Sequence, residues 1–144
     1  MDTAGKEFSM IFEMICKYLD SKGWRYQPSS DGTIIKSGFS GKNAQRIDCY
    51  IRVEEERNEI HLRTFNYVNV PEEKKANMYK LCSQMNKKYS WVKFYVDDED
   101  NTVTLADDAV VDPSTCGDEA YGLMFRMLLI CDDAYPEFMR TLYA

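Results

Sequence analysis

Two neighbouring stretches of this chain alternate between apolar and polar residues, and this alternation constrains the fold more than any other feature. In the first stretch, 46–54, the apolar side is formed by Ile47, Cys49, Ile51 and Val53. In the second, 59–67, it is formed by Ile60, Leu62 and Thr64. Successive side chains of a β-strand point to opposite faces, so a period of two predicts two strands that are each buried on one face. The polar residues 55–58 between them predict an antiparallel hairpin.

Three other segments have the spacing of helices. From Glu7 to Lys22, apolar residues recur every three or four positions, and Gly23 follows where a helix-ending glycine is expected. A second helix is predicted from Pro71 to about Lys88, because proline is favoured in the first helical turn. The last helical region follows Pro113 and is apolar around much of its circumference. We expect Pro136 to separate it from a short terminal turn or helix.

Shorter β-rich runs complete the pattern. They lie at 24–26 and 33–36, on either side of turn-forming residues, and at 91–97 and 102–106, on either side of an acidic tip. The predicted order is therefore α-β-β-β-β-α-β-β-α, in a single domain that spans residues 1–144. Hairpins between segregated helices predict an α+β fold of two layers, with an antiparallel sheet that carries the helices on one face.

Charge and cysteine usage limit the compartment and the partners. The 144 residues include 24 acidic and 18 basic side chains, and the formal net charge of −6 disfavours binding to phosphate backbones. Five scattered cysteines without a C-x-x-C pair predict reduced thiols in a cytoplasmic protein. The most apolar stretch, 121–131, contains Arg126 and is shorter than the roughly 20 residues that cross a bilayer, so no membrane partner is expected.

The sequence contains no complete phosphate-binding, metal-binding or catalytic motif. The glycines of Ser37–Asn43 end like a phosphate-binding loop, but Lys36 stands in place of the first glycine and Asn43 in place of the final Ser or Thr. The acidic run Asp97–Asn101 lacks the central glycine and terminal glutamate of a calcium loop. His61 is the single histidine and has no partner of a recognisable motif nearby. We therefore predict no catalytic residue, no metal and no cofactor.

The polar side of the predicted strands is more informative, because aromatic and cationic residues gather there. This predicted interaction face consists of Tyr50, Arg52, His61, Arg63, Phe65, Lys93 and Tyr95. Such a mixture stacks bases or grips an extended chain, but it also forms ordinary sheet surface, because Tyr and Phe favour strands and the stems of Arg and Lys cover apolar area. The three strong cations predict a locally basic contact face on an acidic protein.

The second half of the chain resembles a known family in its series of elements and a few side chains. Val70-Pro71 opens a helix, Met85-Asn86 lies near its end, an aromatic strand runs from Tyr89 to Asp97, and Val103-Thr104-Leu105 precedes a closing apolar helix. This series resembles the YbjN family of bacterial proteins, and the first helix and its strands fit the same arrangement. The resemblance implies a fold similar to that of type III secretion chaperones, which commonly dimerise and hold segments of other polypeptides, and a role in sensory transduction. Asn86 matches an Asn of the family, and we expect it to cap its helix and tie it to the next strand.

Together these observations favour a non-enzymatic protein-interaction, chaperone-like or regulatory module. We expect it to be a cytoplasmic homodimer that binds a protein or peptide client. Two alternatives stay open. One is a small hydrolase-like enzyme in which His61 and carboxylates share a pocket, and the other is single-stranded nucleic-acid binding on the aromatic sheet face.

Overall fold

The strands form one antiparallel sheet in which the order along the chain is almost preserved. The computed structural model describes residues 10–144. The strands are β1 (Gln27–Pro28), β2 (Ile34–Phe39), β3 (Ile47–Glu54), β4 (Glu59–Thr64), β5 (Lys93–Asp97) and β6 (Thr102–Val110). They lie in the order β1-β2-β3-β4-β6-β5, so β1 and β5 are the edges of the sheet.

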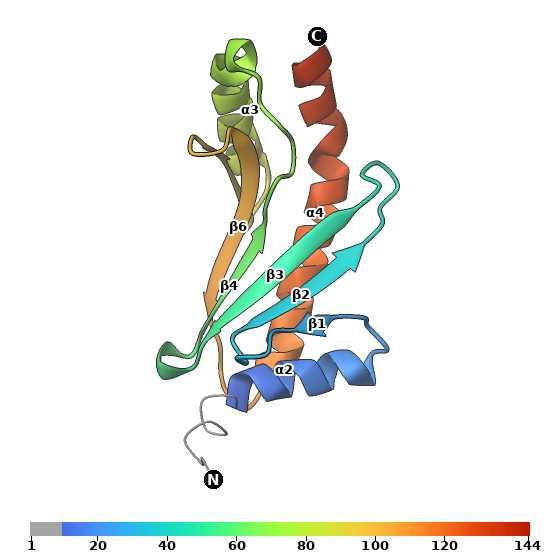
Figure 1. Ribbon diagram of the computed structural model, residues 1–144, viewed down its shortest axis with the longest axis vertical. Helices are drawn as coiled ribbons and strands as arrows, with labels where there is room; N and C mark the ends of the chain where they lie inside the picture. The colour runs from blue at the N-terminus through green and yellow to red at the C-terminus, as the bar shows by residue number, and fades with distance from the viewer. Residues whose placement is uncertain (1–9) are drawn as a thin grey trace.

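Three helices accompany the sheet: α2 (Met10–Ser21), α3 (Lys75–Lys88) and α4 (Cys116–Tyr143). The long helix α4 runs along the sheet, with α2 at the end where α4 begins and α3 at the end where α4 finishes (Figure 1). Short 3-10 turns precede β4 and α3. The predicted α+β class and antiparallel sheet are confirmed. The predicted helix start at Glu7 lies outside the described residues.

One hydrophobic core joins the helices to the inner face of the sheet. Alternate residues of β3 and β4, such as Ile51 and Leu62, are buried as the alternation predicts. They pack with helix residues that include Ile15, Met78 and Met124. Each fully buried side chain of this kind stabilises the fold by roughly 1.5–3 kcal/mol. The remaining strand residues point to the opposite side of the sheet, here called the outer face.

Most strands differ in extent from the prediction, and the differences at β1 and β6 matter most for the sheet. The strand predicted at 24–26 is found at Gln27–Pro28, where proline is tolerated because β1 is an edge. Strand β6 continues four residues beyond Ala106 because it pairs with the whole of β4, from Thr64 opposite Leu105 to Glu59 opposite Val110. This extension moves Asp107 and Asp108 from a predicted loop into the sheet.

Pro136 does not end the last helix, which contradicts our expectation. Proline has no backbone N–H, so a helix that continues through Pro136 leaves the carbonyl of Asp132 without its usual donor. The side-chain amide of Asn43 donates to that carbonyl at 3.0 Å. Beyond the proline, Phe138 is fully buried and holds the last turns of α4 against the core.

Asn43 belongs to a loop that is bound to α4 by a carboxylate. The backbone N–H groups of Lys42, Asn43 and Ala44 all donate to the side chain of Asp132, at 2.8–3.1 Å. A Cβ atom on Gly41 would lie 2.1 Å from Asp132 Oδ1, so only glycine fits there. The loop that partly resembles a phosphate-binding motif therefore holds a carboxylate of its own chain.

Candidate functional site on the outer face of the sheet

Strand register places the predicted interaction face on the outer side of the sheet. Tyr50 lies directly opposite Arg63, and Arg52 lies opposite His61. Arg63 is paired in turn with Ala106, and Ala106 with Lys93. Tyr95 lies opposite Thr104 on the same side of the sheet. Phe65 follows the last residue of β4, and its ring lies 5.7 Å from that of Tyr50.

The cations of this face are engaged by neighbouring groups. Arg52 donates to Glu54 Oε1 at 2.5 Å, and Arg63 donates to Asp108 Oδ1 at 2.7 Å. Lys93 donates to the backbone carbonyls of Asn86 and Tyr89 at the end of α3, at 2.8 and 3.0 Å. The face is therefore charge-balanced around Arg52 and Arg63, instead of the basic patch that we predicted. Asp108 was not among the predicted residues of this face because the strand was expected to end at Ala106, whereas β6 runs to Val110.

His61 lies at the centre of this charged group. Its Nδ1 is 2.7 Å from Asp108 Oδ1, while its Nε2 lies 3.5 Å from Glu54 Oε1 and 3.3 Å from Glu59 Oε1. Burial raises the pKa of Asp108, but hydrogen bonds from Arg63 and His61 outweigh it and lower this pKa below its ordinary value. Asp108 is thus an ionised acceptor and no reservoir of protons for general acid catalysis. His61 lines neither of the cavities described below, so this geometry does not favour the hydrolase alternative.

The aromatic residues occupy the other end of the outer face. Phe65 is 49% exposed and Tyr95 is 43% exposed. Tyr50 and Phe65 line a cavity of about 480 Å³ at the ends of β3 and β4. Lys36 extends over the Tyr50 ring, with Nζ 5.7 Å from its centroid. This end of the face is open and holds apolar surface beside a cation.

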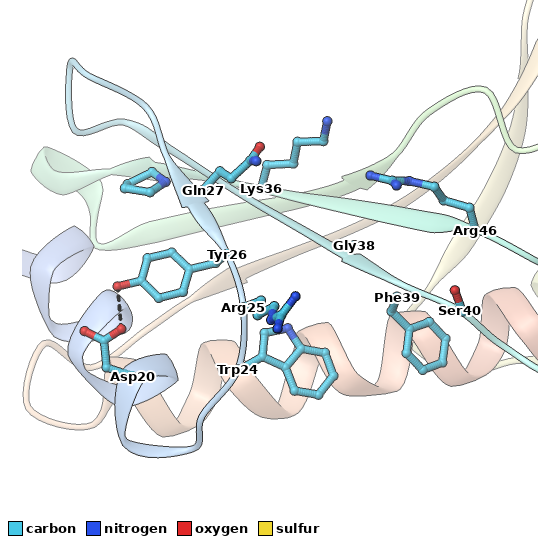
Figure 2. Close-up of a pocket in the computed structure, with 11 residues that line it drawn as sticks. Asp20, Trp24, Arg25, Tyr26, Gln27, Lys36, Gly38, Phe39, Ser40 and Arg46 are labelled. Atoms are coloured by element: carbon cyan, nitrogen blue, oxygen red, sulfur yellow. Dashed lines mark hydrogen bonds between the residues drawn. The ribbon is translucent and has the colours of Figure 1, made fainter.

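A larger cavity of about 870 Å³ lies at the β1 edge of the sheet. Figure 2 shows Trp24, Arg25 and Tyr26 on the segment that leads into β1, with Lys36, Gly38 and Arg46 on or next to β2. Trp24 donates from Nε1 to Ser37 Oγ at 2.5 Å, and Ser37 Oγ donates to the carbonyl of Arg25 at 2.9 Å. These hydrogen bonds hold the segment that precedes β1 against Ser37 of β2. Arg46 lines both cavities, which makes them neighbours.

The backbone of β2 is partly unpaired in this larger cavity. Strand β1 pairs only with Ile35 and Lys36, and the chain before it diverges from β2. Every second residue of a strand turns its N–H and C=O groups to the same edge. The groups of Ile34 and Lys36 face β1. Gly38 is therefore turned to the same edge, beyond the last residue that β1 pairs with. This open edge was not predicted, because a strand at 24–26 would have paired with Gly38, whereas β1 lies at Gln27–Pro28.

The YbjN family model, described as "Putative bacterial sensory transduction regulator", matches residues 12–140. The chain belongs to the YbjN family. The resemblance stated from the sequence is thus confirmed. No curated protein matches the chain in sequence.

Two solved structures resemble this member of the YbjN family. The crystal structure of YbjN from E. coli is 13% identical, with a TM-score of 0.62 over 87% of this chain and 91% of that chain. The ExsC–ExsE complex includes a chain that is 12% identical, with a TM-score of 0.53 over 94% of this chain and 95% of that chain. At these identities the likeness concerns the fold, and it confirms the predicted similarity to secretion chaperones. Among residues 10–144, no helix is long and apolar enough to cross a membrane.

Proposed function

We propose that this YbjN-family protein is a non-enzymatic, chaperone-like regulatory module that binds a segment of another polypeptide. The similar fold in the ExsC–ExsE structure, which is a complex of two proteins, supports a protein partner. We also propose that the protein acts as a homodimer in the bacterial cytoplasm. Four of its five cysteines are buried and none is paired, which suits a reducing compartment.

The observation that carries this proposal is the open edge of β2. An exposed strand edge is a template on which an extended peptide adds as a further strand through main-chain hydrogen bonds. Strand β1 pairs with only two residues of β2. The N–H and C=O groups of Gly38 that face this edge are therefore available for hydrogen bonds to a client. A client segment that pairs there would continue the sheet and would not displace any part of it.

The side chains around this edge indicate which segment fits. Arg25 and Lys36 line the cavity together with Asp20, whose carboxylate accepts a hydrogen bond from Tyr26 at 2.9 Å. Arg46 also lines it and is paired with Asp48, with Nε 3.3 Å from Oδ1. In a protein of net charge −6 such a local excess of cations favours an acidic segment. The cavity lined by Tyr50 and Phe65 adjoins it and would receive an apolar side chain of the same client.

Affinity capture from native cytosol tests this function. The wild-type chain is compared with R25E/K36E, which reverses charges in the cavity, and with K80E/K87E, which makes the same charge change on exposed residues of α3. We expect a captured protein to be lost with R25E/K36E and retained with K80E/K87E. Equal capture by both variants would place the client elsewhere and would contradict the edge proposal. Loss of capture from both would show that binding follows net charge alone.

A further inference from the structure

The hairpin of β3 and β4 brings together three groups that share the chemistry of metal ligands. Glu54 and Glu59 are direct partners across the two strands, and His61 follows on the same face. One ligand atom from each lies within 4.8 Å of the others. Like charges placed directly opposite one another in a sheet are destabilising, so this pair calls for a cation between its members.

The hydrogen bonding of His61 determines what its second nitrogen can do. Asp108 Oδ1 already accepts a hydrogen bond from Arg63 at 2.7 Å, which marks it as an acceptor, so Nδ1 of His61 carries the hydrogen of its 2.7 Å bond to Asp108. In the neutral ring, Nε2 is then a bare acceptor. Nε2 is fully buried and has no hydrogen-bond partner among the described residues. It lies next to two carboxylate oxygens, which are also acceptors, and one of them, Glu54 Oε1, accepts from Arg52 at 2.5 Å. Three converging acceptors match the lone pairs of a metal site.

The distances agree with one geometry in particular. Zinc in proteins is bound tetrahedrally at about 2.0–2.1 Å by His nitrogen and carboxylate oxygen, which separates its ligand atoms by about 3.3–3.4 Å. The separations from Nε2 to the two glutamate oxygens are 3.3 and 3.5 Å. Small shifts of the half-exposed glutamate side chains would complete the tetrahedral edges.

The surroundings supply the outer partners that such sites use. A metal-bound histidine usually donates its other N–H to a carboxylate, which fixes the ring. Asp108 has this role for His61, and Arg63 holds Asp108 in place. Arg52 donates to Glu54 Oε1, which retains a second lone pair, and Arg57 approaches the other oxygen at 4.0 Å. We propose that His61, Glu54 and Glu59 bind a divalent ion of the zinc class, with a fourth position open to water.

Titration of the full-length, metal-free protein with Zn²⁺ and with Co²⁺ tests this site. We expect one ion per chain by calorimetry, and visible bands of tetrahedral Co²⁺ without a thiolate charge-transfer band. The H61A variant should lose binding. Asp108→Asn should weaken it about 10–100-fold through the outer partner.

Glu59→Gln and Glu56→Gln form the matched pair, because both remove one charge from the same hairpin and only Glu59 belongs to the site. Glu59→Gln also removes the unfavourable cross-strand repulsion, so its fold is retained. We expect Glu59→Gln to lose at least tenfold in affinity and Glu56→Gln to bind as the wild type does. Equal binding by these two variants, a thiolate band, or no stoichiometric binding by the folded wild type would each overturn the proposal. None of these outcomes depends on the client-binding edge of β2.

Discussion

Asp107 shows how one residue can couple the stability of this fold to pH. It lies on the inner side of β6, opposite Leu62, and its Oδ2 is buried without a hydrogen-bond partner. Burial, together with the charge of Asp108, raises the pKa of Asp107, while Arg126 and Arg63 oppose the rise. Because the folded state holds the proton more tightly than the unfolded chain, stability decreases as the pH rises from the unfolded pKa through the folded one.

Asp107→Asn should therefore increase the stability of the protein at pH 7. The amide carries no charge, and removing the buried carboxylate should raise the free energy of unfolding by about 1 kcal/mol. Urea denaturation between pH 4 and pH 8 measures this. The wild type should lose stability over the lower part of that range relative to the variant. A variant less stable than the wild type at pH 7 would show that attraction between Asp107 and Arg126 outweighs burial.

Asn86 ties helix α3 to the neighbouring edge strand, as the sequence predicted, but it does not cap the helix, whose C-terminal cap is Tyr89. Its amide donates to the carbonyl of Phe94 at 3.0 Å and accepts from the N–H of Phe94 at 2.6 Å. Asn86→Ala leaves both backbone groups without this partner and should cost about 1–3 kcal/mol of unfolding free energy. Gln84→Ala, an exposed position on the same helix, is the control. Alanine favours the helix at both positions, so a loss for Asn86→Ala no greater than that for Gln84→Ala in chemical denaturation would show that the tie to β5 contributes nothing.

At the scale of elements, the passage of α4 through Pro136 depends on a loop far away in the sequence. Asn43 supplies the donor that the proline lacks, and Asp132 binds three N–H groups of the same loop. The desolvation of Asp132 is outweighed by these backbone hydrogen bonds, which lower its pKa. Helix and loop therefore form one cooperative unit.

A double-mutant cycle measures this cooperation. Asn43→Ala should cost about 1 kcal/mol in the wild-type background, because the carbonyl of Asp132 loses its donor. In the Pro136→Ala background the helix supplies its own N–H, so the same substitution should cost less. Thermal or urea unfolding of the four proteins gives the coupling energy. A coupling of zero would mean that Asn43 does not compensate for the proline.

Much of the element pattern could be read from the sequence because side-chain periodicity reports burial. The strands β3 and β4 and the apolar face of α2 are examples. The continuation of α4 could not be read, because the donor for Asp132 comes from residue 43. The carboxylates around His61 in the candidate site could likewise not be predicted from the sequence. Parity placed Tyr50, Arg52 and His61 on one face, but the carboxylates of Glu54 and Asp108 reach His61 only through the register of three strands.

For the whole molecule, the outer side of α4 is where we expect the proposed homodimer to form. Phe125 and Leu129 are 40% and 52% exposed and lie one turn apart on α4. Gly122 lies one turn earlier, and a Cβ atom added to it would have no neighbouring atom within 4 Å. Trp91, 64% exposed, lies near Arg126 of the same helix. This apolar strip suits the homodimer proposed above, because small and apolar residues allow two helices to approach closely.

Leu129→Asp should convert a dimer into a monomer without unfolding the chain, because the side chain is exposed. Light scattering after gel filtration gives the mass, and circular dichroism verifies the fold. Val110→Asp alters an apolar residue at the far end of β6 that is more exposed than Leu129, and it should leave the dimer intact. A wild-type chain that is monomeric at all concentrations would contradict the homodimer.

The crowding of Gly41 against Asp132 has a consequence for the evolution of the chain. Any of the other nineteen amino acids would bring a Cβ into the space that the carboxylate occupies. Replacing it would expel Asp132, release three N–H groups at once and free the end of α4. In a saturation-mutagenesis survey of folding, position 41 should rank among the least tolerant sites, although it lies in a surface loop, where variation is ordinarily well accepted.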